Sequence, residues 1–188
     1  MRRSCAVDVA PVRAEPRDDA EQVTQALRGE PLAVLVAGAG WARIETLYGY
    51  AGWIHEEALG PAAEGIWPKP VGKDVLTEAR AYLGAPYEWG GMTERGIDCS
   101  GLIHMAFRRI GILVPRDSWQ QGAHGEPVDA DDLTPGDVIW YEGHTAFSTG
   151  EARILHASAR EGVRAVVEEP EPPELAATLR SRRRFLVR

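Results

Sequence analysis

Cysteine, long apolar runs and excess positive charge are all scarce in this chain of 188 residues. It has two cysteines, Cys5 and Cys99, too few and too far apart for a disulfide framework, so the redox state of the compartment is left open. No apolar run approaches the ~20 residues of a membrane-spanning helix. Acidic residues outnumber basic ones, 28 to 21, and the net charge of −7 argues against nucleic acid or an anionic membrane as the main partner.

The first ten residues have the positive charges of a secretion signal but lack its apolar centre. Arg2 and Arg3 are soon followed by Asp8, which interrupts the apolar stretch, so we expect the protein in the cytoplasm. The one basic run, 180–188, alternates with apolar residues. This pattern is typical of an edge or terminal strand with solvated arginines.

Short β-prone segments separated by turns occupy residues 1–60. Pro31–Val36 is a compact β-prone run, Trp41–Thr46 alternates with period two, and Tyr50–Ile54 follows a turn. Several strands in so few residues predict a small all-β barrel. Three prolines in residues 61–72 then predict an extended linker.

Residues 73–188 have a different pattern. A helical periodicity over 73–83 is followed by an aromatic, glycine-rich loop, a second helical segment and a series of strands from Asp137 onward. Helices first and an antiparallel sheet afterwards predict an α+β domain.

Cys99 stands at the start of the second helical segment. Apolar residues recur with helical spacing from Leu102 to Ile110, and Gly111 is a stop signal. A thiol in the first turn of a helix has a lowered pKa, so Cys99 is predicted to be a thiolate nucleophile. Cys5 has no comparable surroundings and is expected to be structural.

A thiolate nucleophile needs a base, and the base needs a group that orients it. His144 and His156 flank a predicted hairpin, and if the hairpin is centred on Gly150 the two stand directly opposite each other. Cross-strand partners have Cβ atoms about 4.5–5.5 Å apart. We therefore expect His144 to take the proton of Cys99, while His156 accepts a hydrogen bond from the far ring nitrogen of His144.

A series of motifs in residues 73–188 resembles, in order, those of the NlpC/p60-type cell-wall peptidases, which are papain-like cysteine peptidases. The motifs are Pro86–Gly91, Asp98–Leu102, Pro135–Val138, Gly143–His144 and Leu155–Ser158. The resemblance implies a papain-like α+β fold with Cys99 as nucleophile, His144 as base and His156 as orienting residue. It also places Tyr87 beside the cysteine, where its hydroxyl helps to hold the site or the oxyanion.

Residues 1–60 resemble a bacterial SH3-like (SH3b) domain, on the segments Leu27–Glu30, Gly40–Ile44 and Gly49–Ile54. The combination is similar to intracellular γ-D-glutamyl-L-diamino acid endopeptidases. It implies hydrolysis of the amide bond between γ-D-glutamate and L-lysine or diaminopimelate, in peptidoglycan stem peptides with a free N-terminal L-alanine. The implied role is cell-wall peptide recycling or turnover, without a metal or other cofactor.

A free α-ammonium group requires a carboxylate near the cleft, since an unpaired buried charge costs several kcal/mol. By resemblance, Asp117 is that carboxylate, Arg116 holds a substrate carboxylate in a forked pair, and Ser118 adds a hydrogen bond. The remaining positions predicted to bind substrate are Asp98, Ser100, Glu30 and Tyr50. For Glu30 and Asp117 the alternative is a solvated turn carboxylate.

Two other functions stay open. Cys99, His144 and His156 can in principle bind zinc and leave an open position for water, although the chain lacks paired Cys-x-x-Cys or His-x-x-x-His ligands. Alternatively, the chain is a non-catalytic cell-wall-binding protein anchored by its SH3-like domain.

Overall fold

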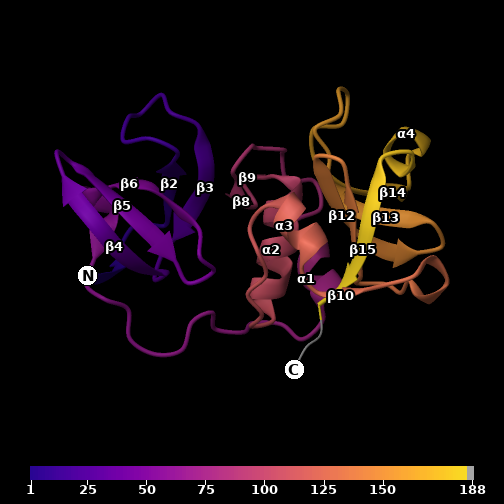
Figure 1. The fold of residues 1–188 in the computed structure, drawn as a ribbon, viewed down its shortest axis with the longest axis horizontal. Coiled ribbons are helices and arrows are strands. Elements are labelled where there is room, and N and C mark those ends of the chain that lie inside the picture. Colours follow the sequence, from indigo (N-terminus) through magenta and orange to yellow (C-terminus); the bar gives the residue numbers. More distant parts are fainter. Residues whose placement is uncertain (186–188) are drawn as a thin grey trace. The chain divides into compact units, whose positions relative to one another are not determined.

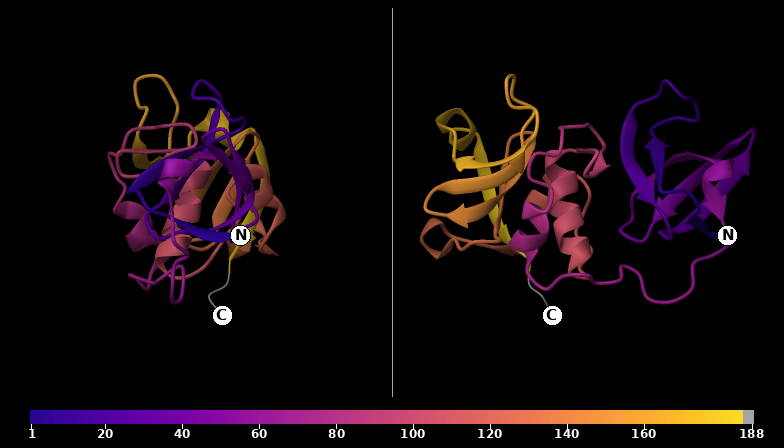
Figure 2. Two further views of the ribbon diagram at one scale, coloured as in Figure 1. Left: turned by 90° about the vertical axis from the view of Figure 1, so that its left-hand side faces the viewer. Right: turned by 180° about the vertical axis from the view of Figure 1, so that it is seen from behind.

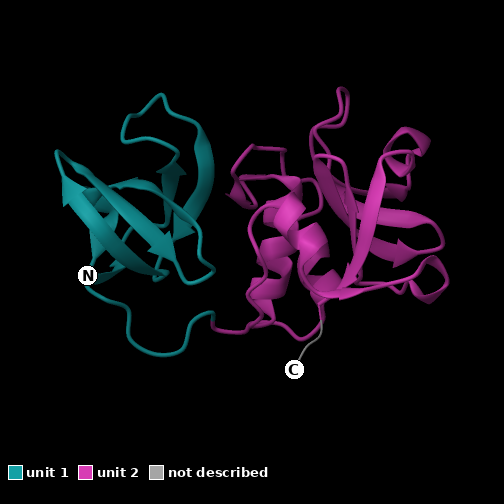
Figure 3. Cartoon of the chain, in the orientation of Figure 1, with its two compact units in different colours: residues 1–68 teal, residues 69–188 magenta. Residues whose placement is uncertain are grey.

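The computed structural model describes residues 1–185, and the chain forms two compact units, residues 1–68 and 69–188 (Figure 3). The predicted boundaries, a domain over 1–60 and another over 73–188 with a linker between them, stay a prediction. The end of the predicted basic run, 186–188, lies outside the described residues.

The first unit is built on one seven-stranded antiparallel sheet in the order β3-β2-β6-β5-β4-β1-β7, which confirms the predicted SH3-like, all-β architecture. Its strands are β1 Arg2–Cys5, β2 Val9–Arg13, β3 Gln22–Leu27, β4 Pro31–Gly38, β5 Trp41–Thr46, β6 Ala51–His55 and β7 Leu59–Gly60. A 3-10 turn, Glu56–Ala58, precedes β7.

Alternation of side chains along these strands builds the core of the first unit. In β5, Ala42, Ile44 and Thr46 are buried while the residues between them are exposed or half-buried. The hairpin from β4 to β5 turns at Ala39 and Gly40, both with positive φ, as a two-residue turn between twisted strands requires. Cys5 belongs to this core, which confirms its structural interpretation.

The second unit places helices against a six-stranded antiparallel sheet in the order β10-β15-β11-β12-β13-β14 (Figure 1). The strands are β10 Glu126–Pro127, β11 Val138–Tyr141, β12 His144–Gly150, β13 Arg153–Ala157, β14 Val166–Pro170 and β15 Leu179–Arg184. The other elements are α1 Val75–Arg80, the short strands β8 Met92–Thr93 and β9 Gly96–Ile97, α2 Cys99–Arg109, α3 Ser118–Ala123, a 3-10 turn Ala130–Asp132 and α4 Pro173–Ala176. This confirms the predicted α+β class.

The two faces of this sheet have different partners. Helices α2 and α3 pack on one face, as Figures 1 and 2 show from opposite sides. Phe107 of α2 meets Phe147 of β12 there, with ring centroids 5.7 Å apart. On the other face, Tyr141 and Ile139 pack with Leu175 of α4. The candidate catalytic residues lie on these packed elements: Cys99 at the start of α2, His144 at the start of β12 and His156 on β13.

Strand β15 does not hold its arginines uniformly in solvent, and the prediction of a solvated basic edge is wrong for Arg184. Its guanidinium pairs with the buried carboxylate of Asp137, with Nη2 2.6 Å from Oδ2. The strand lies inside the sheet, between β10 and β11. Among residues 1–185, no helix combines the length and the apolar character needed to cross a bilayer.

Candidate active site

Cys99 is the first residue of α2, as predicted, and is 6% exposed. Asp98 caps this helix: its Oδ1 accepts a hydrogen bond from the Gly101 amide at 2.6 Å, and its Oδ2 accepts one from the Gly90 amide at 2.7 Å. A Cβ at Gly101 would lie 2.4 Å from the Gly91 carbonyl oxygen, so only glycine lets the loop approach the helix this closely. The loop and the helix start are thereby fixed together.

Arg116 holds Asp98 rather than a substrate carboxylate. Its Nη1 and Nη2 donate to the two carboxylate oxygens of Asp98 at 2.9 and 2.8 Å, and Nη1 also donates to Ser100 Oγ at 2.8 Å. The Arg116 side chain is 1% exposed. Because the guanidinium fork is filled and buried, the prediction that Arg116 pairs with substrate is wrong. Asp98 and Ser100 likewise brace the helix start.

The surroundings of Cys99 do not favour a resting thiolate. Burial, followed by the negative charge of Asp98, raises the pKa of the thiol to about 12. Backbone amides of Thr145 and Ser100 donate to the sulfur and oppose this rise only in part. The expected lowering of the pKa by the helix terminus is therefore wrong for the substrate-free site, and Cys99 must lose its proton during the reaction.

His144 and His156 lie together, although not in the predicted register. His144 Nε2 is 2.8 Å from His156 Nδ1, and the rings meet edge to face at 83° with centroids 5.0 Å apart. Strands β12 and β13 pair Phe147 with Leu155 and turn at residues 151–152, so the histidines are not directly opposite. The two side chains nevertheless reach each other through the hydrogen bond between His144 Nε2 and His156 Nδ1.

Both imidazoles are neutral at ordinary pH. Burial and the neighbouring His156 lower the pKa of His144 to about 3. Burial also lowers the pKa of His156, although Glu169 acts in the opposite direction. Thr145, the residue after His144, contacts the Cys99 sulfur through its amide. The residue that follows the neutral His144 therefore contacts the neutral thiol.

Tyr87 lies in the loop before Cys99. Its amide donates to the Arg164 carbonyl at 2.9 Å, and it forms an isolated bridge with Ile97. Burial, followed by Cys99 and Asp98, raises the pKa of the phenol above its ordinary value, so the hydroxyl keeps its proton and can donate a hydrogen bond.

The other predicted substrate-binding residues occupy several elements. Asp117 is half-buried and forms a capping box with Gln120 at the start of α3, which begins at Ser118. In the first unit, Glu30 has no exposed surface, and its Oε2 accepts from the Leu27 amide at 3.2 Å, so a solvated turn carboxylate is the wrong description of it. Tyr50 is half-buried. Substrate contacts of these residues stay predictions.

Glu169 and Arg160 are site residues that the sequence did not reveal. His156 Nε2 is 3.0 Å from Glu169 Oε1, and Arg160 Nη2 donates to both oxygens of Glu169 at 3.0 and 2.8 Å. The signal that the sequence offers is a β-branched pair, Val166–Val167, before the glutamates. That pattern is typical of a strand but does not tell which strand it pairs with.

These contacts bear on the zinc alternative. Both ring nitrogens of His156 lie within hydrogen-bond distance of protein groups, His144 and Glu169, which leaves neither free for a metal. Within residues 1–185, no three His, Cys, Asp or Glu side chains converge as a metal site. The geometry favours acid–base chemistry at these residues over metal ligation.

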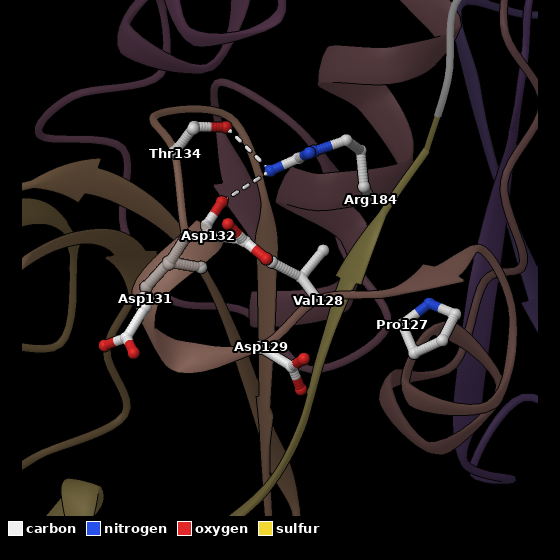
Figure 4. A pocket seen from close by; sticks show the side chains of 8 residues that line it. Pro127, Val128, Asp129, Asp131, Asp132, Thr134 and Arg184 are labelled. Atoms are coloured by element: carbon white, nitrogen blue, oxygen red, sulfur yellow. Dashed lines mark hydrogen bonds between the residues drawn. The ribbon is translucent and has the colours of Figure 1, made fainter.

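A pocket of about 370 Å³ opens beside the two histidines. Its lining combines charged and apolar side chains and includes Glu142, His144, His156, Arg160, Pro172, Glu174 and Leu175. A separate pocket of about 440 Å³ contains no predicted catalytic residue (Figure 4). There Arg184 donates to Thr134 Oγ1 and to the Asp132 carbonyl, which ties the acidic segment to β15.

Comparisons with known proteins agree with this geometry. A model of the NlpC/P60 family matches residues 84–180, and one of the bacterial dipeptidyl-peptidase Sh3 domain matches residues 12–59. Dipeptidyl-peptidase 6 of Lysinibacillus sphaericus is 28% identical over 156 residues, 79% of this chain and 58% of that protein. A γ-D-glutamyl-L-lysine dipeptidyl-peptidase of Bacillus cereus is 34% identical over 102 residues, 50% of this chain and 31% of that protein.

The fold has solved relatives as well. The crystal structure of an NlpC/P60 family protein from Bacillus cereus superimposes with a TM-score of 0.59 at 25% identity, covering 99% of this chain and 63% of that chain. The chain thus spans less than two thirds of the length of these relatives. With the family model covering the loop, the cysteine helix and the histidine strands, the chain belongs to the NlpC/P60 family of cysteine peptidases.

Proposed function

We propose that this chain hydrolyses the γ-D-glutamyl–L-diamino acid amide bond of peptidoglycan-derived peptides that carry a free N-terminal L-alanine. The observation that carries the proposal is the contact of the buried Cys99 thiol with the amide of Thr145, the residue that follows His144, whose ring lies 2.8 Å from that of His156. The match to a dipeptidyl-peptidase Sh3 domain and the names of the relatives support the substrate class. The cytoplasm, where free stem peptides are processed, is the proposed compartment.

The chemistry follows from the protonation states. As Cys99 Sγ attacks the γ-carbonyl carbon, its proton passes to the free ring nitrogen of His144. The amide C–N bond breaks, the leaving amine takes that proton, and a thioester remains. Water then attacks the thioester and gives a proton to His144. This proton returns to the sulfur as the γ-glutamyl carboxylate leaves.

Because the Cys99 thiol and the His144 imidazole are both neutral before the reaction, these steps constitute a general-base mechanism. Since burial raises the pKa of Cys99 and lowers that of His144, an ion pair forms only as the bond to carbon forms. His156 supports the imidazolium that His144 becomes, and the amide of Ser100 and the Tyr87 hydroxyl are donors near the developing oxyanion.

Substrate recognition is assigned to groups on either side of the scissile bond. Asp117, with Ser118 beside it, is the proposed partner of the L-alanine ammonium group, and contacts of Glu30 and Tyr50 with the substrate stay predictions. For the leaving diamino acid we propose the pocket beside the histidines, which offers apolar Leu175 for an aliphatic stem and carboxylates for an amine.

The test is hydrolysis of L-Ala-γ-D-Glu-L-Lys and of its diaminopimelate counterpart, followed by mass spectrometry. Cys99→Ala is expected to abolish release of the diamino acid, while Cys5→Ala, the matched buried cysteine in the first unit, keeps activity. Full activity of Cys99→Ala ends the proposal. Elemental analysis of the purified protein distinguishes a cysteine peptidase from the zinc-dependent alternative, because stoichiometric zinc would overturn the assignment of Cys99 as nucleophile.

Recognition of the free amine has its own test. Acetylation of the substrate's L-alanine removes the positive charge, and we expect turnover to be lost. Unchanged kinetics on the acetylated peptide contradict a role for Asp117 in amine binding without touching the assignment of Cys99. Binding to intact cell walls without hydrolysis of any stem peptide favours the non-catalytic alternative.

A further inference from the structure

Glu169 extends the histidine pair by one more hydrogen bond. It lies on β14, which pairs with β13 so that His156 stands opposite Val167. His156 is 3% exposed and Glu169 has a side chain that is 24% exposed, so the contact between Nε2 and Oε1 at 3.0 Å runs from the buried site toward the surface. His144, His156 and Glu169 thus form one continuous series of hydrogen bonds.

Arg160 keeps this carboxylate charged and in place. Although burial acts to raise the pKa of Glu169, hydrogen bonds with Arg160 and His156 lower it below the ordinary value. Arg160 itself is 40% exposed and lies 3.9 Å from Glu174. An ionised Glu169 only accepts hydrogen bonds, which determines what the facing nitrogen of His156 must carry.

The consequence is a choice between two arrangements of protons. With an ionised Glu169, His156 carries its hydrogen on Nε2, its Nδ1 is a lone pair, and His144 must donate from Nε2. A neutral His144 then has Nδ1 free to accept the proton of Cys99. In the opposite arrangement His156 donates from Nδ1, His144 carries its hydrogen on Nδ1, and no nitrogen is available for the thiol.

We propose that Glu169 is a positioning residue that selects the productive tautomers of His156 and His144. The inference rests on the proposed function, because it assumes that His144 is the base for Cys99. Glu169 acts through His156 and does not touch the substrate. Its role resembles that of a carboxylate behind a catalytic histidine, moved one imidazole further from the nucleophile.

The first experiment compares Glu169→Gln with Glu168→Gln. Glu168 is the neighbouring residue on β14, has a similarly exposed side chain at 22%, and pairs with Arg80 at 2.9 Å, so it controls for loss of a strand ion pair. Glutamine donates as well as accepts, so Glu169→Gln admits both tautomer arrangements. We expect kcat to fall at least about 10-fold with little change in KM. Glu168→Gln is expected to stay within about twofold of the unmodified protein.

The pH profile separates positioning from general damage. The titratable and charged groups around the histidines come from several elements. They are Asp98, which caps α2, Tyr141 of β11, whose ring centroid lies 6.1 Å from that of His144, Arg160 from the loop after β13, Glu169 from β14, and Glu142 and Glu174, which line the same pocket. Glu169 raises the pKa of His156, so its neutralisation is expected to move the acid limb of kcat/KM to lower pH. A purely structural defect lowers the rate without moving the limb.

Tautomers are also measured directly, by ¹⁵N NMR of histidine-labelled protein. We expect His144 to have a protonated Nε2 and an unprotonated Nδ1 in the unmodified protein, and a mixture in Glu169→Gln. If Glu169→Gln fails to fold, Arg160→Gln, which leaves Glu169 in place, is expected to give a smaller change of the same kind.

Two results overturn the inference: kinetics of Glu169→Gln equal to those of Glu168→Gln, or unchanged ¹⁵N shifts of His144. Failure of the proposed function is distinguishable from either. An active Cys99→Ala removes the nucleophile assignment, whereas an inactive Cys99→Ala together with a normal Glu169→Gln removes only the role of Glu169.

Discussion

The buried ion pair of Asp98 and Arg116 gives the sharpest stability prediction. Their side chains are 7% and 1% exposed, and two hydrogen bonds of 2.8 and 2.9 Å join them. Arg116→Ala leaves the Asp98 carboxylate buried without its cation. Removing one partner of such a pair costs about 3–5 kcal/mol, so we expect a loss of ~4 kcal/mol in the free energy of unfolding of the second unit.

This magnitude is large enough to measure by two routes. For a unit of this size a loss of ~4 kcal/mol corresponds to a fall in Tm of roughly 12–20 °C. Urea unfolding followed by circular dichroism gives the free energy independently. The matched control is Arg80→Ala, which breaks a pair with side chains 43% and 22% exposed and is expected to cost no more than ~1 kcal/mol.

A double variant distinguishes an unpaired charge from lost packing. Asp98→Ala with Arg116→Ala removes both charges, and we expect it to cost less than the sum of the two single changes. The reasoning is refuted if Arg116→Ala unfolds with the same free energy as Arg80→Ala, or if the double variant loses the full sum.

Three further predictions concern the site and its support. Burial raises the pKa of Cys99 to about 12, so its alkylation by iodoacetamide is expected to be slow at pH 7 and to climb beyond pH 9; a plateau below pH 7 contradicts this. Burial acts to raise the pKa of Asp137, but hydrogen bonds, chiefly from Arg184, bring it below its ordinary value, so its stabilisation is present above about pH 4 and is lost on acidification. Asp137→Asn should therefore cost ~1.5–3 kcal/mol in urea unfolding at pH 7 and progressively less as the pH falls below about 4, and a cost that does not change with pH argues against it. Gly101→Ala places a Cβ 2.4 Å from the Gly91 carbonyl oxygen and is expected to lower both Tm and kcat, with a net cost of ~1–3 kcal/mol; a stable, fully active variant rules this out.

Local signals predicted the elements that carry their own start and stop information. Helix α2 begins at Cys99 after the capping Asp98 and ends before Gly111, whose φ is +88°. Helix α3 escaped prediction because it is short and contains Gly122. A Cβ at Gly122 would lie 2.3 Å from the Trp140 ring. Glycine is therefore needed at this position for the helix to approach the sheet, although glycine lowers the helix propensity of the segment.

The hairpin between the histidines shows the limit of a symmetry argument. Gly150 was the expected centre, but Glu151 and Ala152 form the turn with φ of 51° and 54°, a conformation rarely expected of such residues. The register also shifts between Ser148 and Gly150. Residue types alone predicted that two histidines serve one cysteine, whereas the shape of their contact depended on this irregular turn.

The sequence does not predict ion pairs and hydrogen bonds between side chains of distant segments. The family resemblance assigns Arg116 to a substrate carboxylate, yet its guanidinium binds Asp98, 18 positions earlier. The sequence does not point to Glu169, because the strand that lies next to His156 is determined by sheet pairing and not by spacing along the chain. In both cases a charged side chain found its partner through tertiary contacts.

These two ion pairs together constrain how substrate charge is recognised. Asp98 with Arg116 and Glu169 with Arg160 each sum to zero, and the thiol and imidazoles between them are neutral, so this catalytic set carries no net formal charge. It offers no unbalanced carboxylate to the ammonium group of an N-terminal L-alanine. If the free amine is required, as proposed, the attraction must come from outside the set, with Asp117 as the candidate. Asp117→Asn is therefore expected to raise KM for the free peptide and leave kcat nearly unchanged, and a fall in kcat alone would return Asp117 to a purely capping role.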